Sequence, residues 1–223
     1  MTRVAESTAW RKRTRDEIAA RLAEDIFEGA YVNLGIGMPT LVANHVPTGR
    51  EIVLQSENGL LGMGPPPAPG EEDLALVNAG KQPVTLLPGG AYFDSADSFA
   101  MMRAGHLDIA VLGAFQVSES GDLANWHTGR PGDIPAVGGA MDLAVGAKHT
   151  WVMMEHFTHD GACKLVSRCD YPLTGLRCVN RVYTDLAVLD VTVGGFVLRD
   201  AVGGLDAESL SQLSGVAIAP PHR

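Results

Sequence analysis

The feature that most constrains the fold is a series of short apolar runs in which apolar and polar residues hardly alternate. Strands of this kind are covered on both faces, as in a parallel sheet with helices on either side, whereas a strand with one wet face alternates. Helical stretches stand between several of the runs. The sequence therefore predicts an α/β fold, a three-layer α/β/α sandwich around an open, mostly parallel sheet. The predicted strands are Tyr31–Leu34, Ile52–Gln55, Val84–Leu87, Leu107–Leu112 and Trp151–Met154.

The first predicted helix has a clear start. Thr14 and Glu17 have the spacing of a capping box, and apolar residues recur behind them at helical period until Gly29. A proline-rich stretch at 65–70 should be a stiff surface loop. We expect one domain spanning residues 1–223, with flexible ends at 1–13 and 217–223. Further helices are predicted at Thr40–His45, Ser95–Arg103 and Met141–Ala147, and from Asp206 until Gly215 ends the last one.

The net charge and the cysteine pattern exclude several classes of function. The chain of 223 residues has a formal net charge of −9, and basic residues cluster only at Arg11–Arg15, so we expect no nucleic-acid partner. The apolar stretches fall far short of the roughly 18 residues that a membrane span needs, and no apolar signal region follows the polar N-terminus. Cys163, Cys169 and Cys178 fit neither a disulfide framework nor a zinc pair. These patterns predict a cytoplasmic protein with reduced thiols and no membrane association.

One carboxylate stands at a strand end, where an open α/β sheet binds its ligands. Ser56-Glu57-Asn58-Gly59 directly follows the apolar run Ile52–Leu54, and Asn-Gly forces a turn that exposes the position before it. Glu57 is therefore a candidate nucleophile. The alternative is that Glu57 only solvates a turn.

A glycine pair before a predicted helix is a second candidate site. Gly138 and Gly139 precede Met141–Ala147, and the first N–H groups of a helix have no partner within it. Such groups suit an anionic oxygen that forms during acyl transfer. Close packing against a neighbour is the alternative reason for glycine at these positions.

Two other glycine pairs mark turns that either are only tight or keep the backbone open for a ligand. Gly35 and Gly37 stand between a strand and a helix, but the third glycine of a dinucleotide fingerprint is absent. Gly89 and Gly90 follow the strand that is predicted to end at Leu87. Both pairs are kept as a possible ligand loop.

Metal and thiol chemistry are not predicted. In the segment Glu155–Asp160 the two histidines are three residues apart, whereas the H-E-x-x-H zinc motif needs four, so ordinary loop residues are the main interpretation. The sequence contains no Gly-x-Ser-x-Gly elbow, and no cysteine stands in a context that would activate it. We therefore expect no metal site.

Several motifs together resemble one family. The segments Asn33–Thr40, Ser56–Pro65, Gly113–Trp126 and Gly138–Leu143 resemble the β subunit of the 3-oxoacid coenzyme A-transferases, and the resemblance runs from Thr14 to Val193. The Ser-Glu-Asn-Gly turn is the most specific of these motifs. Residues 125–129, 134–137 and 181–186 look more like the branch acting on 3-oxoadipate than the one acting on acetoacetate.

The resemblance implies a CoA-transferase/sugar-phosphate isomerase-like fold and a ping-pong mechanism. Glu57 would attack succinyl-CoA to give a mixed anhydride, and the released CoA thiolate would attack Glu57 to give a glutamyl-CoA thioester. That thioester would pass CoA to a 3-oxo acid. CoA is then a substrate, and no cofactor or metal is implied. The residues expected to contact substrate or stabilise an oxyanion are Gly138, Gly139, Asn58 and Gly59, and the possible ligand loop is Gly35, Gly37, Gly89 and Gly90.

The resemblance also implies a partner chain. The family's CoA-binding glycine-rich loop belongs to its α subunit, so we expect an α subunit and an assembly of two α and two β chains. Positive charge for the two anionic substrates would come from that partner or from residues such as Lys81, Arg103 or Lys148.

Three alternatives remain open. The acceptor could be acetoacetate or another 3-oxoacid in place of 3-oxoadipate. The chain could be a non-catalytic sensor domain of the same fold, in which Glu57 is only a turn residue, or a CoA-ester hydrolase in which water takes the glutamyl group.

Overall fold

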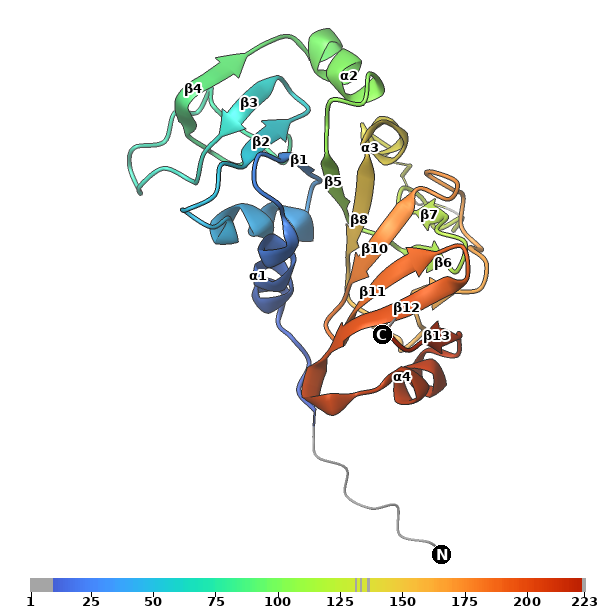
Figure 1. Cartoon of the computed structure of the whole chain (residues 1–223). Coiled ribbons are helices and arrows are strands. Elements are labelled where there is room, and N and C mark those ends of the chain that lie inside the picture. Colours follow the sequence, from blue (N-terminus) through green and yellow to red (C-terminus); the bar gives the residue numbers. More distant parts are fainter. Residues whose placement is uncertain (1–9, 131, 133, 136, 222–223) are drawn as a thin grey trace, which may run out of the picture.

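The computed structural model describes residues 10–130, 132, 134–135 and 137–221 (Figure 1). Within them a ten-stranded sheet has the order β13-β12-β11-β10-β8-β5-β1-β2-β3-β4. A small sheet has the order β7-β6-β9. The strands of the large sheet are β1 (Tyr31–Leu34), β2 (Val53–Ser56), β3 (Leu60–Met63), β4 (Leu86–Tyr92), β5 (Ile109–Leu112), β8 (His149–Met153), β10 (Val179–Tyr183), β11 (Ala187–Thr192), β12 (Gly195–Ala201) and β13 (Ile218–Ala219). The small sheet consists of β6 (Gln116–Ser118), β7 (Leu123–Ala124) and β9 (Leu165–Val166).

The centre of the large sheet is parallel. Strand β1 pairs in parallel with β2 and β5, and β8 pairs in parallel with β5 and β10. Antiparallel hairpins continue the sheet on both sides, through β3 and β4 at one edge and through β11 and β12 at the other. Strand β13 is parallel to β12. The predicted open, mostly parallel sheet is confirmed, with antiparallel additions that the sequence reasoning did not identify.

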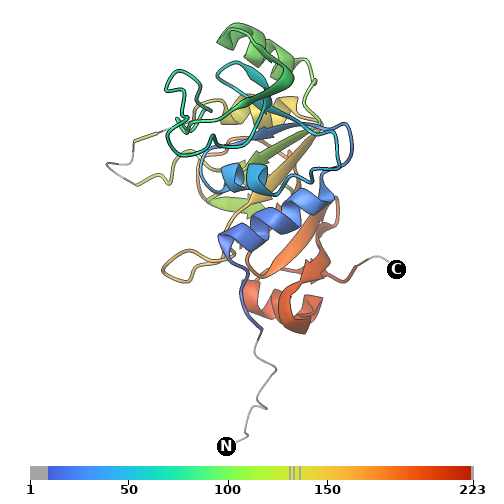
Figure 2. The same cartoon turned by 90° about the vertical axis from the view of Figure 1, so that its left-hand side faces the viewer.

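Helices cover both faces of the sheet. The helix α1 (Arg15–Asp25) and the 3-10 helix η1 (Met38–His45) lie side by side on one face (Figure 2). On the other face lie α2 (Ser95–Arg103), α3 (Ala140–Gly146), α4 (Ala207–Ser214) and the small sheet (Figure 1).

The position of β5 explains why apolar and polar residues do not alternate in it. Ile109 and Val111 belong to the buried cluster that contains α1, and Ala110 and Leu112 belong to the buried cluster on the opposite face. Both faces of the strand are therefore apolar. The predicted three layers are confirmed.

Local signals place the start of α1 and the end of α4 where the sequence predicted them, whereas α1 ends at Asp25, before the predicted Gly29. Glu17 N–H donates to Thr14 Oγ1 at 3.2 Å, and Thr14 N–H donates to a carboxylate oxygen of Glu17 at 2.7 Å, so the capping box forms. At the other end of the chain, Gly215 ends α4 with a φ of 71°, a left-handed conformation that glycine adopts without strain.

The prediction for the glycine pair at 89 and 90 is wrong in its location. Strand β4 begins two residues later than predicted and runs through Pro88, Gly89 and Gly90 to Tyr92. Because β4 is an edge strand, paired only with β3, a proline without an N–H donor is tolerated in it. Gly89 and Gly90 therefore lie in a strand at the sheet edge and not in a loop, and their contact with a ligand stays a prediction.

The described parts of both chain ends are held by contacts. Ile218 and Ala219 pair with Phe196 and Val197 of β12. The predicted flexibility of residues 217–221 stays a prediction. Near the other end, the N–H of Arg13 donates to the backbone oxygen of Asp185 at 2.8 Å. Residues 1–9 and 222–223, also predicted to be flexible, lie outside the described residues. None of the described helices is both long and apolar enough to cross a membrane.

His156, one of the two histidines of the segment Glu155–Asp160, is a buried structural residue. His156 Nδ1 lies 3.0 Å from Thr184 Oγ1, and His156 Nε2 lies 2.8 Å from Ser214 Oγ, so both ring nitrogens have partners. Burial lowers the pKa of His156 to about 4. The imidazole thus fastens the end of α4 to the sheet. Among the described residues no cluster of three or more His, Cys, Asp and Glu side chains could hold a metal ion.

Candidate active site

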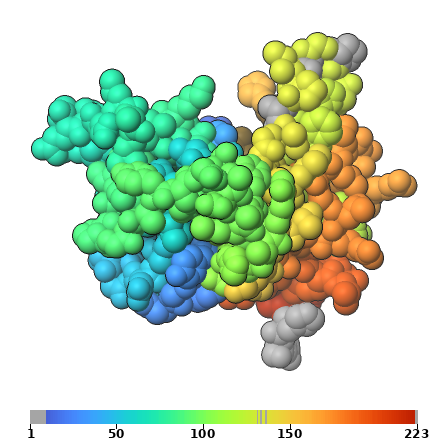
Figure 3. Space-filling view, turned by 90° about the horizontal axis from the view of Figure 1, so that it is seen from above, coloured from blue at the N-terminus to red at the C-terminus, as the bar shows by residue number. Residues whose placement is uncertain are grey.

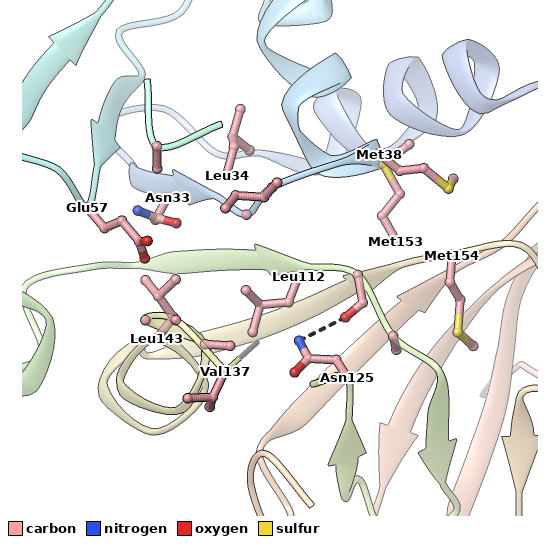
Figure 4. Close-up of a pocket in the computed structure, with 18 of the residues that line it drawn as sticks. Asn33, Leu34, Met38, Glu57, Leu112, Asn125, Val137, Leu143, Met153 and Met154 are labelled. Atoms are coloured by element: carbon pink, nitrogen blue, oxygen red, sulfur yellow. Dashed lines mark hydrogen bonds between the residues drawn. The ribbon is translucent and has the colours of Figure 1, made fainter. Parts of the chain in front are cut away.

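A pocket of about 360 Å³ lies at the carboxyl ends of the central parallel strands (Figure 4). Its lining includes residues that directly follow four of these strands: Gly35 after β1, Glu57 after β2, Gly113 after β5 and Met154 after β8. Strand β1 has β2 on one side and β5 on the other, so the chain changes direction across the sheet at this point. Open α/β sheets bind ligands at such switch points.

Two loops border the end of the sheet at which the pocket opens. Figure 3 shows the connection between β3 and β4, in teal, and the segment after β7, in yellow-green, on opposite sides of a recess. Ala79 from the first segment and Val137 beyond the second line the pocket.

The hairpin between β2 and β3 positions Glu57. Gly59 N–H donates to Ser56 O at 3.0 Å, and Gly59 has a φ of 114°. A Cβ atom at position 59 would overlap the backbone oxygen of Phe93, so both the conformation and the space require glycine. The tight turn leaves Glu57 at the end of β2 with its carboxylate directed toward α3 (Figure 4).

The carboxylate of Glu57 is half-buried and has no hydrogen-bond donor or ion-pair partner among the described residues. Burial raises the pKa of Glu57 above its ordinary value, and the negative charge of Asp142 raises it further. Asp142 lies in the first turn of α3 and accepts a 2.7 Å hydrogen bond from Arg103 Nε. The ionised form of Glu57 is thus destabilised where it stands.

Gly139 is in direct contact with Glu57. A Cβ atom at position 139 would overlap Glu57 Oε2 and would lie 3.2 Å from Cζ of Phe99. Gly138 and Gly139 both line the pocket, and Gly139 is the residue before α3. The structure therefore brings the predicted glycine pair and the predicted nucleophile together in one pocket, which Gly35 also lines.

The remaining predicted residues have structural roles in the turns. Asn58 Nδ2 donates to Val77 O at 2.8 Å, and neither Asn58 nor Gly59 lines the pocket. Gly37 precedes η1 with a φ of 90°. The predicted contacts of Asn58, Gly59 and Gly37 with a ligand stay predictions.

A chain of buried amides lies beside Glu57, and sequence reasoning missed it. Asn33, which lines the pocket, donates from Nδ2 to Gln55 Oε1 at 2.5 Å, and Gln55 Nε2 donates to Ser98 Oγ at 2.7 Å. These bonds tie β1, β2 and α2 together around the turn that holds Glu57. The available signal was a polar residue inside each of two apolar strands, which must find a partner when it is buried.

The three basic residues singled out in the sequence do not line the pocket. Arg103 is paired with Asp142, and Lys148 Nζ is paired with Asp108 Oδ1 at 2.8 Å. Lys81 is exposed, has a φ of 61°, and follows Ala79 of the pocket lining by two residues.

Among the described lining residues the cation is Lys164, which sequence reasoning missed. Its signal is a lysine that interrupts an otherwise apolar stretch, with Ala162 and Cys163 before it and Leu165 and Val166 after it. A charged residue in such a stretch is either exposed or, when it is buried, needs a partner for its charge.

The cysteines are not candidate nucleophiles. Burial raises the pKa of Cys169 and Cys178 to about 11 and raises that of Cys163 as well. The thiols are therefore protonated at neutral pH, and all three are free. Glu57 is the stronger candidate for covalent chemistry.

A family model and several known proteins match most of the chain. The family described as "Coenzyme A transferase" matches residues 15–202. The chain is 64% identical over 211 residues to a "3-oxoadipate CoA-transferase" subunit of Pseudomonas putida, which covers 95% of this chain and 99% of that protein. It is also 50% identical over 200 residues to a "Probable succinyl-CoA:3-ketoacid coenzyme A transferase" subunit of Bacillus subtilis, covering 89% of this chain and 92% of that protein.

Solved structures share the fold. An acyl-CoA transferase of Escherichia coli O157:H7 superposes with a TM-score of 0.69 at 19% identity, over 95% of this chain and 43% of that chain. Glutaconate coenzyme A-transferase of Acidaminococcus fermentans superposes with a TM-score of 0.67 at 18% identity, over 96% of this chain and 91% of that chain.

Proposed function

Because the chain belongs to the coenzyme A transferase family and is the β subunit of such an enzyme, we propose that it moves CoA from succinyl-CoA to 3-oxoadipate, with Glu57 as the covalent carrier. The observation that carries this proposal is a half-buried carboxylate without a donor among the described residues, held against Gly139 in a pocket at the strand ends. Such a group costs stability, and groups of this kind cluster at functional sites.

The first half-reaction exchanges one acyl bond for another. A carboxylate oxygen of Glu57 attacks the thioester carbonyl of succinyl-CoA, the C–S bond breaks, and CoA leaves as a thiolate. The thiolate attacks the glutamyl carbonyl of the resulting mixed anhydride, and succinate leaves with its carboxylate charge restored. Glu57 then carries CoA as a thioester.

The second half-reaction runs the same steps in reverse with the acceptor acid. A carboxylate oxygen of the 3-oxo acid attacks the glutamyl thioester, CoA leaves as a thiolate, and that thiolate attacks the acceptor carbonyl of the new anhydride. The bond to Glu57 breaks and its carboxylate is restored. Protons need not be supplied, so the scheme requires no metal and no cofactor, with CoA acting as a substrate.

The electrostatics of the pocket favour the covalent states. A carboxylate is a weak nucleophile in water, and removing its solvent without adding donors raises its basicity. Acylation makes Glu57 neutral, so its repulsion from Asp142 disappears in both the anhydride and the thioester. The N–H groups at Gly138 and Gly139 are proposed to stabilise the tetrahedral oxyanions, a contribution of about 3 kcal/mol per donor.

The relatives support the acceptor and the partner. The 64% identical relative is named for 3-oxoadipate, so 3-oxoadipate is the proposed acceptor. The 50% identical relative is named only for a 3-ketoacid, so a different 3-oxoacid, with acetoacetate as the example, is the second candidate. Both names describe one subunit of a transferase, which supports assembly with an α subunit, proposed here as two of each chain. The cytoplasmic location stays a prediction.

Isotope exchange tests the covalent scheme. The co-expressed α and β chains are incubated with succinyl-CoA and labelled succinate in the absence of a 3-oxo acid. Label should enter succinyl-CoA, because the glutamyl thioester returns CoA to succinate. Exchange that requires a 3-oxo acid would contradict a ping-pong carrier, and net release of CoA at the transfer rate would identify a hydrolase.

The acceptor is tested with the same complex. The ratio kcat/KM should be higher for 3-oxoadipate than for acetoacetate. The reverse order would assign the chain to the second candidate and leave the covalent scheme intact.

A further inference from the structure

Lys164 is a cation inside the pocket that contains Glu57. It directly precedes β9, and its half-buried side chain lines the cavity. Its Nζ lies 3.5 Å from the backbone oxygen of Ala114, a long contact, and no ion pair joins it to a carboxylate among the described residues.

The surroundings leave this ammonium group under-compensated. Burial lowers the pKa of Lys164, the charges of Glu155 and Asp185 oppose this effect, and the charge of Arg15 adds to it. Both of those carboxylates already hold other cations, since Glu155 pairs with Arg15 and Asp185 with Lys12. A half-buried ammonium that lacks its own counter-ion gains free energy when an anion enters beside it.

Lys164 and Glu57 lie at different ends of the pocket. Glu57 stands beside α3, whereas Asn125 and Met154 lie at the opposite end (Figure 4). Lys164 belongs to the Asn125 end, because its Nζ contacts the oxygen of Ala114 and Asn125 Nδ2 donates to the adjacent Gly113 O at 3.1 Å.

Apolar side chains occupy the lining between the two ends. Leu112 lies between Glu57 and Asn125 (Figure 4), and the lining also contains the apolar side chains of Leu34, Leu143 and Met153. The pocket therefore offers a reactive carboxylate, then an apolar wall, then a cation. This order matches an acyl group with a reactive carbonyl, a methylene chain and a remote carboxylate.

From this arrangement we infer that Lys164 binds the remote carboxylate of a dicarboxylic acyl group while the other end of that group reacts at Glu57. The inference rests on the proposed function of Glu57 and adds the residue that selects the class of acid. An acyl group that ends in a methyl would leave the half-buried ammonium unpaired. A site built for a polar group rejects an analogue that lacks this group far more strongly than one that differs by a methylene.

The test compares two donors that differ only at the remote end. In butyryl-CoA a methyl replaces the remote carboxylate of succinyl-CoA. For the purified complex of α and β chains, the ratio of kcat/KM for succinyl-CoA over butyryl-CoA should fall about 30-fold or more in Lys164→Met, because truncating one partner of a buried charge pair costs at least this factor. Lys164→Arg should recover part of the ratio.

Two control variants make the result specific. Lys148→Met removes a lysine that is paired with Asp108 outside the pocket lining, and its ratio should stay at the wild-type value. Lys81→Met removes an exposed lysine on a nearby loop. A ratio that collapses in Lys81→Met and is unchanged in Lys164→Met would overturn the inference.

A second measurement on the wild-type complex tests the inference if the Lys164→Met chain does not fold. In the wild-type complex, reductive methylation of Lys164 should be slowed by succinate and not by butyrate, as read by peptide mass mapping. Equal labelling with both acids would overturn the inference. Failure of the wild type to form any acyl bond at Glu57 would instead remove the proposed function, so the two failures are distinguishable.

Discussion

Asp25 and Glu57 are two partly buried carboxylates with opposite surroundings. The Oδ2 atom of Asp25 accepts a hydrogen bond from the Tyr183 hydroxyl at 2.8 Å and lies 3.1 Å from Nη1 of Arg181, while Oδ1 lies 3.0 Å from Nη1 of Arg21. Glu57 has neither a donor nor a cation among the described residues, and Asp142 adds a like charge.

The two pKa shifts follow from this difference. Burial acts to raise the pKa of Asp25, but hydrogen bonds from Arg21 and Tyr183 and the charges of Arg21 and Arg181 outweigh it, so the pKa lies below its ordinary value. Burial raises the pKa of Glu57 with nothing to offset it. The same chain gives Asp25 donors and cations, so the lack of both is what distinguishes Glu57, the proposed nucleophile, from a structural carboxylate.

The largest expected effect separates the two carboxylates by activity. Glu57→Gln removes the attacking oxygen charge and should lower kcat by about 10⁴-fold or more, as loss of a covalent nucleophile does in other enzymes. Asp25→Asn should leave kcat within threefold of the wild type. Steady-state assays of the complex measure both, and comparable losses in the two variants would erase the distinction.

Gly139 tests whether the close approach to Glu57 matters. In Gly139→Ala the new Cβ overlaps Glu57 Oε2 and crowds Phe99, so Glu57 moves and kcat should fall about 100-fold to 1000-fold. Gly49→Ala is the matched control, because a Cβ at position 49 meets no atom within 4 Å. A Gly139→Ala enzyme with the wild-type rate would show that this contact does not position the nucleophile.

The effects of the two carboxylates on stability should have the opposite order to their effects on activity. Asp25→Asn breaks a cluster in which the Asp25 side chain is 14% exposed, and should lower the free energy of unfolding by about 2 kcal/mol. Glu57→Gln removes an uncompensated charge and should leave the urea midpoint unchanged or raised. Asp190→Asn, at a side chain that is 32% exposed, should cost less than Asp25→Asn. A larger loss of stability in Glu57→Gln than in Asp25→Asn contradicts the comparison.

The smallest expected effect is a shift of the acid limb of the rate profile. Glu57 must be ionised to attack, so the rate of acylation falls as the pH drops through its raised pKa. Asp142→Asn removes a like charge, lowers the pKa of Glu57, and should move the limb to lower pH. Arg103→Leu removes the cation paired with Asp142 and should move the limb to higher pH. Shifts in the same direction for both variants, measured by single-turnover consumption of succinyl-CoA, would refute this electrostatic account.

The position of Glu57, the candidate nucleophile, could be predicted because it depends on local signals. An apolar strand followed by Asn-Gly determines the turn at Glu57 from adjacent residues, and the structure has that turn. The capping box at Thr14 and the left-handed Gly215 are local in the same sense.

The features that were missed depend on partners far away in the sequence. Pairing of Asn33 with Gln55 and of Gln55 with Ser98 joins segments 22 and 43 residues apart, so neither strand alone shows what its polar residue binds. The edge position that lets β4 include Pro88 is likewise a property of the whole sheet. The sequence does not show that Lys164 lies in the pocket of Glu57, because this position depends on how β5 and β9 are placed in the fold.

Chemical trapping tests the central claim most directly. The complex of α and β chains is mixed with succinyl-CoA, treated with borohydride, digested and mapped by mass. The account predicts that Glu57 is reduced to an alcohol, and that this modification is lost when succinyl-CoA is omitted. An unmodified Glu57 in a complex that consumes succinyl-CoA would contradict it.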